Sequence, residues 1–303
     1  MIRTLEEMEK LVLSQPKQTL ALASAMSEES ILAVEEARAK GCIDVHLVGD
    51  TDFIRNVCEK HGIDMDNFTI TDEKDPAAAA EKAVRLVSEG RAGLVMKGQL
   101  ETSDFLRAVV NKEWGMRTKD RMCGVSLIEC RVLNRMLILA DVGTNIAPDV
   151  KTKASILESC FTVARAMGIE NPKAAVLCAV EKPNEKMPCT LEAAELKQMY
   201  LNGEISGITE GPISMDLAVN PRSAQIKKYD GLIQGDADIL LAPDLEAGNI
   251  LIKALLNLTS DIRSAGVGMG SRVPLIQTSR ADDHETKYFS IILAAMISQH
   301  MFR

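Results

Sequence analysis

Several features that mark common classes of protein are absent from this chain. No run approaches the ~18 apolar residues of a membrane helix, and the charged opening, MIRTLEEMEK, lacks the apolar segment of a signal peptide. The 35 Lys and Arg residues against 43 Asp and Glu residues give a net charge of −8, and no Lys/Arg-rich block stands out. These absences predict a cytoplasmic protein that binds neither a membrane nor nucleic acid.

Cofactor and metal motifs are also lacking. The chain has no P-loop, and GVGMG at 266–270 misses the GxGxxG spacing of a dinucleotide site. Its seven cysteines contain no CxxC pair and its four histidines are dispersed, so reduced thiols, most of them in the core, are expected. We therefore expect no metal and no permanently bound cofactor.

The sequence does contain a regular alternation of strand-like and helix-like segments. Apolar runs at 19–25, 42–49, 68–71 and 92–98 are separated by single helical segments, and a second series begins near 123. Such spacing implies right-handed βαβ units and a parallel, doubly wound sheet. Ser27 and Asp75 are expected to cap two of the helices and Gly62 to end another, and the closing segment, 285–301, is apolar on more than one face and is expected to be buried against a sheet. At 303 residues the chain is long enough for two such α/β domains, each with its own core.

Five predicted strand ends combine a Gly or Pro with short polar side chains. They lie at 96–107, 139–149, 211–221, 242–249 and 278–283. One such end is weak evidence, because an Asp in this place, such as Asp141 or Asp244, is more often a helix cap. The carboxyl ends of parallel strands meet at one edge of a sheet, however, so five of them indicate a binding site.

The last of these ends, TSRADD, has the clearest chemistry. Ser279 and Arg280 place a hydroxyl and a guanidinium before a helix, which suits a phosphate group, and Lys97 followed by Gly98 offers a second cation. The alternative for Arg280 is a structural ion pair with Asp282, Asp283 or Glu285. From the residues alone, the chain is predicted to be an enzyme that handles a phosphate-bearing substrate.

These five motifs, in this order, resemble those of the phosphate acetyltransferase and phosphate butyryltransferase family. The likeness spans roughly residues 90 to 290 and is greater to the butyryl branch. The matching residues are Gly98, Thr102, Asp104 and Arg107; Ala140, Asp141 and Asn145; Gly211, Pro212, Asp216, Ala218 and Val219; PDLEAGN at 243–249; and Ser279 with Arg280.

The resemblance implies a reversible reaction in which acyl-CoA and phosphate give acyl phosphate and CoA. It implies two αβα domains of the isocitrate/isopropylmalate dehydrogenase type with a cleft between them, 1–130 plus 266–303 and 131–265, and commonly a homodimer. Coenzyme A is then a substrate, as are phosphate and the acyl phosphate. The residues expected to bind substrate are Lys97, Gly98, Thr102, Arg107, Asp141, Asn145, Asp216, Asp244 and Asn249.

The resemblance also implies catalytic roles. A carboxylate takes the proton of the CoA thiol, and the thiolate attacks the acyl carbonyl directly. Arg280 would hold the phosphoryl group and Ser279 would donate a hydrogen bond to the tetrahedral intermediate or the leaving oxygen. The acetyl branch has its proposed base, an Asp, seven residues after the serine, where this chain has Thr286. Asp282, Asp283 and Glu285 are the nearby substitutes, of which Asp283 and Glu285 are the expected catalytic residues, and the identity of the base is left open.

Two alternatives remain at this point. The first is a metal- and NAD(P)-dependent hydroxyacid dehydrogenase of the same fold, with Asp141, Asp216 and Asp244 as metal ligands. The second is a CoA-binding relative that has lost catalysis, which the missing Asp at position 286 would explain.

Overall fold

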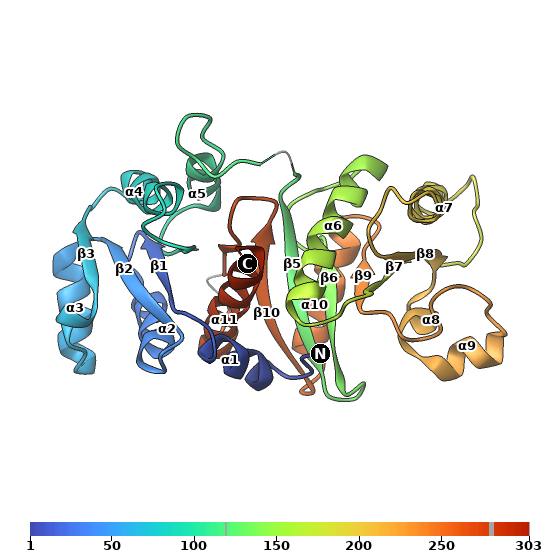
Figure 1. Ribbon diagram of the computed structural model, residues 1–303, viewed down its shortest axis with the longest axis horizontal. Helices are drawn as coiled ribbons and strands as arrows, with labels where there is room; N and C mark the ends of the chain where they lie inside the picture. The colour runs from blue at the N-terminus through green and yellow to red at the C-terminus, as the bar shows by residue number, and fades with distance from the viewer. Residues whose placement is uncertain (119, 279–281, 303) are drawn as a thin grey trace. The chain divides into compact units, whose positions relative to one another are not determined.

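The structure, a computed structural model, describes residues 1–118, 120–278 and 282–302, and the chain divides into two compact units. We call residues 5–119 and 265–303 the N-terminal unit, and residues 1–4 and 120–264 the central unit. Both contain strands and helices (Figure 1), which confirms the mixed α/β class expected from the sequence. That each unit is an independent domain stays a prediction.

In the N-terminal unit the strand order is β3-β2-β1-β4-β11-β10. All neighbours are parallel except β10 and β11. Helices α2, α3 and α11 cover one face of these strands, and α4 and α5 cover the other (Figure 1). The elements are α1 (Leu5–Leu13), β1 (Gln18–Ala23), α2 (Glu28–Ala39), β2 (Ile43–Gly49), α3 (Thr51–His61), η1 (Met65–Asn67), β3 (Thr69–Asp72), α4 (Pro76–Ser88), β4 (Leu94–Lys97), α5 (Thr102–Val109), β10 (Ile262–Met269), β11 (Leu275–Ile276) and α11 (His284–Met301).

The helix ends of this unit follow local sequence signals. The Ser27 side chain accepts a hydrogen bond from the Ser30 N–H at 3.3 Å, and Asp75 caps α4 through the Ala78 N–H at 2.8 Å. Gly62 ends α3 with a φ of 65°, the left-handed conformation that glycine adopts without steric cost. These three predicted helix ends are confirmed.

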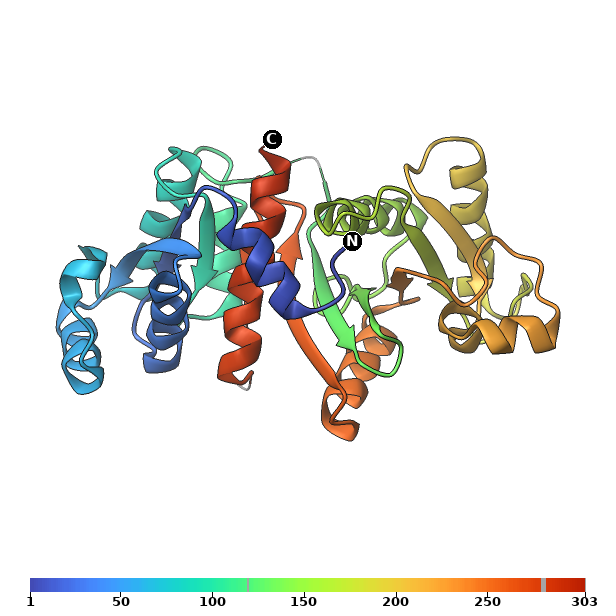
Figure 2. The same cartoon turned by 60° about the horizontal axis from the view of Figure 1, so that its bottom comes forward.

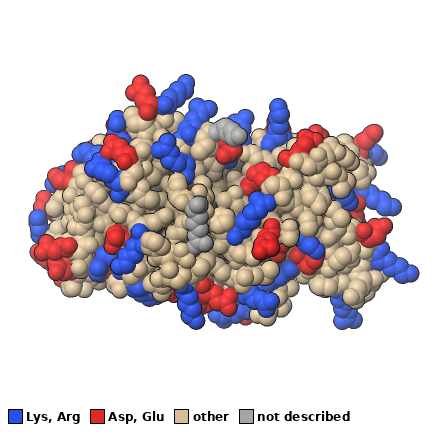
Figure 3. Space-filling model, in the orientation of Figure 1, with Lys and Arg blue, Asp and Glu red and all other residues tan. Residues whose placement is uncertain are grey.

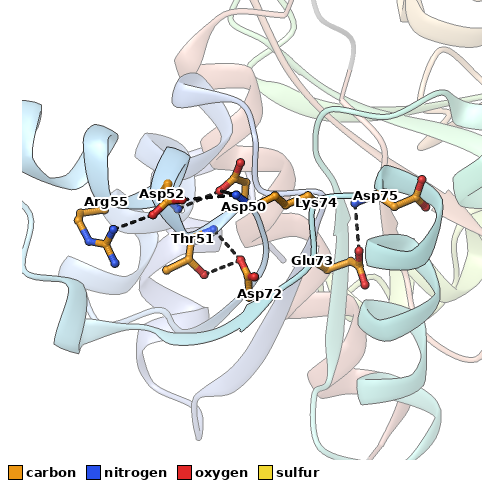
Figure 4. Close-up of polar contacts among 8 residues, drawn as sticks. All are labelled: Asp50, Thr51, Asp52, Arg55, Asp72, Glu73, Lys74 and Asp75. Carbon is orange, nitrogen blue, oxygen red and sulfur yellow. Dashed lines mark hydrogen bonds and ion pairs between the residues drawn. The ribbon is translucent and has the colours of Figure 1, made fainter.

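A polar cluster joins β2 and β3 to the helices that follow them (Figure 4). The Asp72 carboxylate accepts hydrogen bonds from the Thr51 N–H at 3.0 Å and the Thr51 hydroxyl at 2.8 Å. Asp50 caps α3, and the Lys74 ammonium lies 3.4 Å from the carboxylates of both Asp50 and Asp52. The cluster therefore satisfies the helix N-terminus and neutralises part of its own charge.

Helix α11 is buried along most of its length. Every residue from 287 to 298 is buried, and α1 packs beside the helix (Figure 2), where the Tyr288 hydroxyl donates to Glu9 at 2.7 Å. Contacts with β4 and β11 confirm that this closing segment lies against the sheet. Among the described residues, no helix combines the length and the apolar character needed to span a membrane.

In the central unit the strand order is β5-β6-β9-β7-β8. Strands β6, β9, β7 and β8 are parallel, with α6 and α7 on one face and α8 and α9 on the other (Figure 1). The elements are β5 (Cys123–Cys130), β6 (Arg135–Ala140), α6 (Val150–Ala166), β7 (Lys173–Leu177), α7 (Pro188–Leu201), β8 (Ile208–Ile213), α8 (Met215–Val219), α9 (Pro221–Lys227), β9 (Ile239–Leu241) and α10 (Leu245–Leu258).

The expectation of wholly parallel strands is wrong at two places. Strands β5 and β6 form an antiparallel hairpin, because only residues 131–134 connect them and a parallel crossover needs about a dozen residues or more. Asn134 turns this hairpin with a φ of 50°. The second antiparallel pair is β10 with β11, again joined by a short connection.

Candidate functional site

The N-terminal unit has a pocket at the carboxyl ends of three neighbouring parallel strands. Because β1 pairs with β4 and β4 pairs with β11, all three end at the same edge of the sheet. The cavity has a volume of about 320 Å³. Its lining residues are Ser27, Glu28, Glu29, Ser30, Lys97, Gly98, Gln99, Thr278 and Lys287.

The floor of the pocket depends on a close approach between the ends of β1 and β4. The Gly98 N–H donates to the Ala23 carbonyl at 2.8 Å, and the Ser24 hydroxyl donates to the Gln99 carbonyl at 2.9 Å. A Cβ atom on Gly98 would lie 2.3 Å from the Ser24 carbonyl oxygen. Glycine therefore lets the two strand ends meet, and the lysine before it lines the pocket.

Two buried ammonium groups line this pocket. Lys97 is 8% exposed and Lys287 is 3% exposed. The Lys97 Nζ donates to the Leu100 carbonyl at 3.2 Å, and the Lys287 Nζ donates to a Glu29 carboxylate oxygen at 2.7 Å and to the Asp282 carbonyl. Both ammonium groups therefore already have partners, and Glu28 and Glu29 also line the cavity, so an anionic ligand suits the pocket where it adds to or replaces those partners.

The N-terminus of α2 adds to this preference. Ser27, which precedes the helix, lines the cavity together with the first-turn residues Glu28, Glu29 and Ser30. Helix N-termini carry a partial positive charge from their N–H groups, which favours phosphate groups. Two lysines and a helix terminus thus surround a cavity of small-ligand size.

The predicted residues of this unit have different places. Lys97 and Gly98 line the pocket, whereas Thr102 and Arg107 are not among its lining residues. Thr102 begins α5, and the Arg107 guanidinium, with its side chain 75% exposed, pairs with Asp104 at 2.7 Å.

Two of the four predicted catalytic residues, Asp283 and Glu285, lie at the start of α11. The Asp283 carboxylate caps this helix by accepting from the Thr286 N–H at 2.7 Å, and Glu285 is exposed in its first turn. Ser279 and Arg280 lie outside the described residues. Thr278, the residue before Ser279 in the sequence, lines the pocket.

Lys287 was missed by the sequence reasoning. It belongs to the segment ETKYFSIILAAM, which was predicted to be buried, and it is the one charged residue between positions 286 and 299. A single lysine in a buried helix is a signal in itself, because burying an ammonium group requires a partner.

In the central unit, Asp141 organises the loop after β6. One carboxylate oxygen accepts from the N–H groups of Gly124, Gly143 and Thr144 at 2.9 to 3.1 Å. The other accepts from the backbone N–H of Asn145 at 2.9 Å and from its side-chain amide at 2.6 Å. With five donors, this buried carboxylate fixes the loop conformation.

The PDLEAGN motif packs against the same loop. Asp244 caps α10 by accepting from the Ala247 N–H at 2.8 Å, and the Asn249 amide donates to the Val142 carbonyl at 3.0 Å. A Cβ atom on Gly248 would lie 2.2 Å from the Asp141 carbonyl oxygen. The close approach that this glycine allows is to the protein's own backbone.

Asp216 has a separate environment at the start of α8. Its carboxylate accepts from the Ser214 hydroxyl at 2.8 Å and lies 3.1 Å from the Lys227 ammonium. The Ser214 hydrogen bond, and next the one from Lys227, hold the pKa of Asp216 below its usual value. Within the described part of the chain, no group of three His, Cys, Asp or Glu side chains is arranged to hold a metal ion.

Charged side chains of both signs are interspersed over the face shown in Figure 3. Exposed ion pairs of the protein include Arg55 with Asp52 at 2.8 Å and Arg91 with Glu89 at 2.7 Å. The buried lysines of the pocket differ from these because their ammonium groups lie beneath the surface.

Comparison with known proteins identifies the family. The sequence profile described as "Phosphate acetyl/butaryl transferase" matches residues 77–295. A phosphate butyryltransferase of Clostridium acetobutylicum is 43% identical over 299 residues, which is 98% of this chain and 99% of that protein. The chain belongs to this family. The resemblance seen in the five motifs is thereby confirmed.

Further relatives extend the comparison. A phosphate acetyltransferase of Thermotoga maritima is 39% identical over 92% of this chain and 95% of that protein. The crystal structure of a branched-chain phosphotransacylase from Enterococcus faecalis V583 matches with a TM-score of 0.82 and 30% identity, covering 92% of this chain and 98% of that one. Phosphate acyltransferases of both the acetyl and the butyryl type are thus similar to this chain.

Proposed function

We propose that this chain is an acyltransferase that moves a short acyl group reversibly between coenzyme A and inorganic phosphate. The observation that carries the proposal is the 43% identity to a phosphate butyryltransferase over nearly the full length of both chains. The pocket of the N-terminal unit supports it, because buried lysines at the carboxyl ends of parallel strands suit a phosphate group.

The acyl group passes directly between the two substrates, without a covalent intermediate on the enzyme. The CoA thiol loses its proton to a base, the sulfur forms a bond to the acyl carbon of the acyl phosphate, and the carbon–oxygen bond to phosphate breaks. The reverse reaction begins with attack of a phosphate oxygen on the thioester. Arg280 is proposed to bind the phosphoryl group and Ser279 to stabilise the negative charge on the former carbonyl oxygen.

The base is proposed to be Asp283 or Glu285. Both are acidic residues close to Ser279 in the sequence, and both side chains are exposed, so a thiol could reach them. Substrate contacts of Thr102, Arg107 and Asp216 stay predictions. The same holds for Asp141, Asn145, Asp244 and Asn249, whose contacts as described stabilise the loop after β6 and the start of α10.

Release of free thiol tests the proposed function. Purified protein is mixed with butyryl-CoA, acetyl-CoA or a branched acyl-CoA together with phosphate, and the thiol of CoA is followed with a chromogenic disulfide. Phosphate-dependent thiol release is expected, and its persistence in excess EDTA would separate it from metal-dependent dehydrogenase chemistry. Tight CoA binding without thiol release would instead support the inactive relative.

The finer architecture and the assembly remain part of the proposal. We propose a two-domain arrangement of the isocitrate/isopropylmalate dehydrogenase type, no permanently bound cofactor, a cytoplasmic location and a homo-oligomer. Helix α10 supports the last of these, because three of its apolar side chains are exposed: Ile250 at 68%, Leu256 at 38% and Leu258 at 80%. Light scattering of the wild type and of Leu258→Glu tests it, with a smaller mass expected for the variant.

A further inference from the structure

The pocket of the N-terminal unit contains an ion pair whose two partners differ greatly in exposure. The Lys287 side chain, on α11, is 4% exposed, whereas the Glu29 side chain, in the first turn of α2, is 68% exposed. Their charged atoms are 2.7 Å apart. The buried cation therefore depends on a partner that lies mostly in solvent.

Because of this difference in exposure, an incoming anion can replace the Glu29 carboxylate as the partner of Lys287. An ammonium group has three N–H donors, and Lys287 uses one on Glu29 and one on the backbone carbonyl of Asp282. The hydrogen bond from Lys287 lowers the pKa of Glu29, so the carboxylate is charged at neutral pH. An exposed carboxylate is readily rehydrated when it rotates into solvent, whereas the buried ammonium needs a replacement anion.

We infer that Glu29 is a built-in competitor for the phosphate group of the substrate: it neutralises Lys287 in the empty pocket and is displaced when orthophosphate or an acyl phosphate binds there beside Lys97. Lys287 is then a phosphate-binding residue of the acyltransferase. This inference rests on the proposed acyl transfer.

The size and position of the pocket favour a small phosphate over the whole of coenzyme A. Its volume of about 320 Å³ is at the lower end of the range of roughly 300–1,000 Å³ for small-molecule sites. Thr278 lines the pocket, and the Asp282 carbonyl accepts a hydrogen bond from Lys287, one of its lining residues. A dianionic phosphate also competes better than one carboxylate for two buried lysines.

The experiment compares Glu29→Gln, Lys287→Met and the control Glu36→Gln. Glu36 lies on the same helix and pairs with His284 of α11, so the control removes a similar contact between α2 and α11 outside the pocket. Initial rates of thiol release are measured with phosphate and butyryl-CoA varied separately, at constant ionic strength. The separate KM values distinguish an inorganic phosphate from the phosphates of CoA.

We expect Glu29→Gln to lower the KM for phosphate by about threefold, the size of one partly exposed ion pair, with the KM for butyryl-CoA unchanged. Lys287→Met should raise the KM for phosphate by about tenfold or more, because a charge-assisted hydrogen bond is lost. Glu36→Gln should change neither KM. An unchanged or higher KM for phosphate in Glu29→Gln would overturn the inference, as would an effect of Lys287→Met on butyryl-CoA alone.

The inference can still be tested if one variant does not fold or if the wild type is inactive. If Lys287→Met does not fold, Glu29→Gln decides alone, because it changes an exposed side chain. If the wild type releases no thiol, the proposed function fails, and the exchange is tested by the protection that inorganic phosphate gives against thermal unfolding. That protection should be greater in Glu29→Gln than in Glu36→Gln, and equal protection would refute the exchange.

Discussion

The carbonyl oxygen of Asp141 lies 2.2 Å from the place that a Cβ atom on Gly248 would occupy, so only glycine fits where α10 passes the end of β6. Gly248→Ala should therefore lower the free energy of unfolding by about 1–3 kcal/mol, the cost of overpacking a tight contact. Urea denaturation measures it. The matched control is Gly143→Ala in the loop after β6, where a Cβ atom would meet no other atom within 4 Å. Equal stability of the two variants would contradict the tight contact.

The Asp141 carboxylate accepts five hydrogen bonds, which an amide cannot do. Asp141→Asn turns an NH₂ group toward at least two donors, so we expect a loss on the order of 3 kcal/mol in unfolding free energy. Asp244→Asn serves as control, because Asn caps a helix as well as Asp does. If Asp141→Asn kept full stability and lost only turnover, the residue would act on substrate rather than on the loop.

Arg280→Lys tests the predicted phosphate contact. A planar guanidinium binds phosphate through two parallel hydrogen bonds, which a lysine cannot reproduce, so about 2–4 kcal/mol of transition-state stabilisation should be lost. The loss should appear with phosphate or acyl phosphate varied, at matched folding by circular dichroism. Turnover within about threefold of the wild type, or roughly 0.65 kcal/mol, would assign Arg280 to a structural ion pair instead.

The two candidate bases can be separated by their amide variants, because the capping role of Asp283 survives its replacement by Asn. Asp283→Asn retains the cap on α11, so its stability should be unchanged while kcat falls by about 100-fold or more if Asp283 is the base. Glu285→Gln is the parallel variant. Steady-state kinetics with CoA varied measures both, and two variants with normal kcat would place the base elsewhere in the chain.

Local signals explain how much of the fold could be predicted. Ser27, Asp75 and Gly62 act within one turn of their helices, so the sequence indicates each end directly. Strand β10 was missed because its residues, IRSAGVGM, are rich in glycine and small side chains and resemble a loop. The antiparallel pairing of β5 with β6 follows from the short connection between them, residues 131–134. The alternation of strand-like and helix-like segments in the sequence suggested parallel strands instead.

The site was predicted less completely. Lys97 and Gly98 were found because they follow an apolar strand directly, and strand ends are readable from sequence. Lys287 and Glu29 are 258 residues apart in the sequence, and only the three-dimensional pairing of α11 with α2 brings them together. Ser279 and Arg280, known from motif alone, keep their predicted roles.

Strand β11 lies between β4 and β10, and α11 packs beneath it, although both are made after residues 120–264. On the ribosome, the edge of β4 therefore stays unpaired while the entire central unit is synthesised. Such an edge is a site for wrong pairing with other chains. The nascent N-terminal unit thus keeps this unpaired edge until its last segment, residues 265–303, has been synthesised.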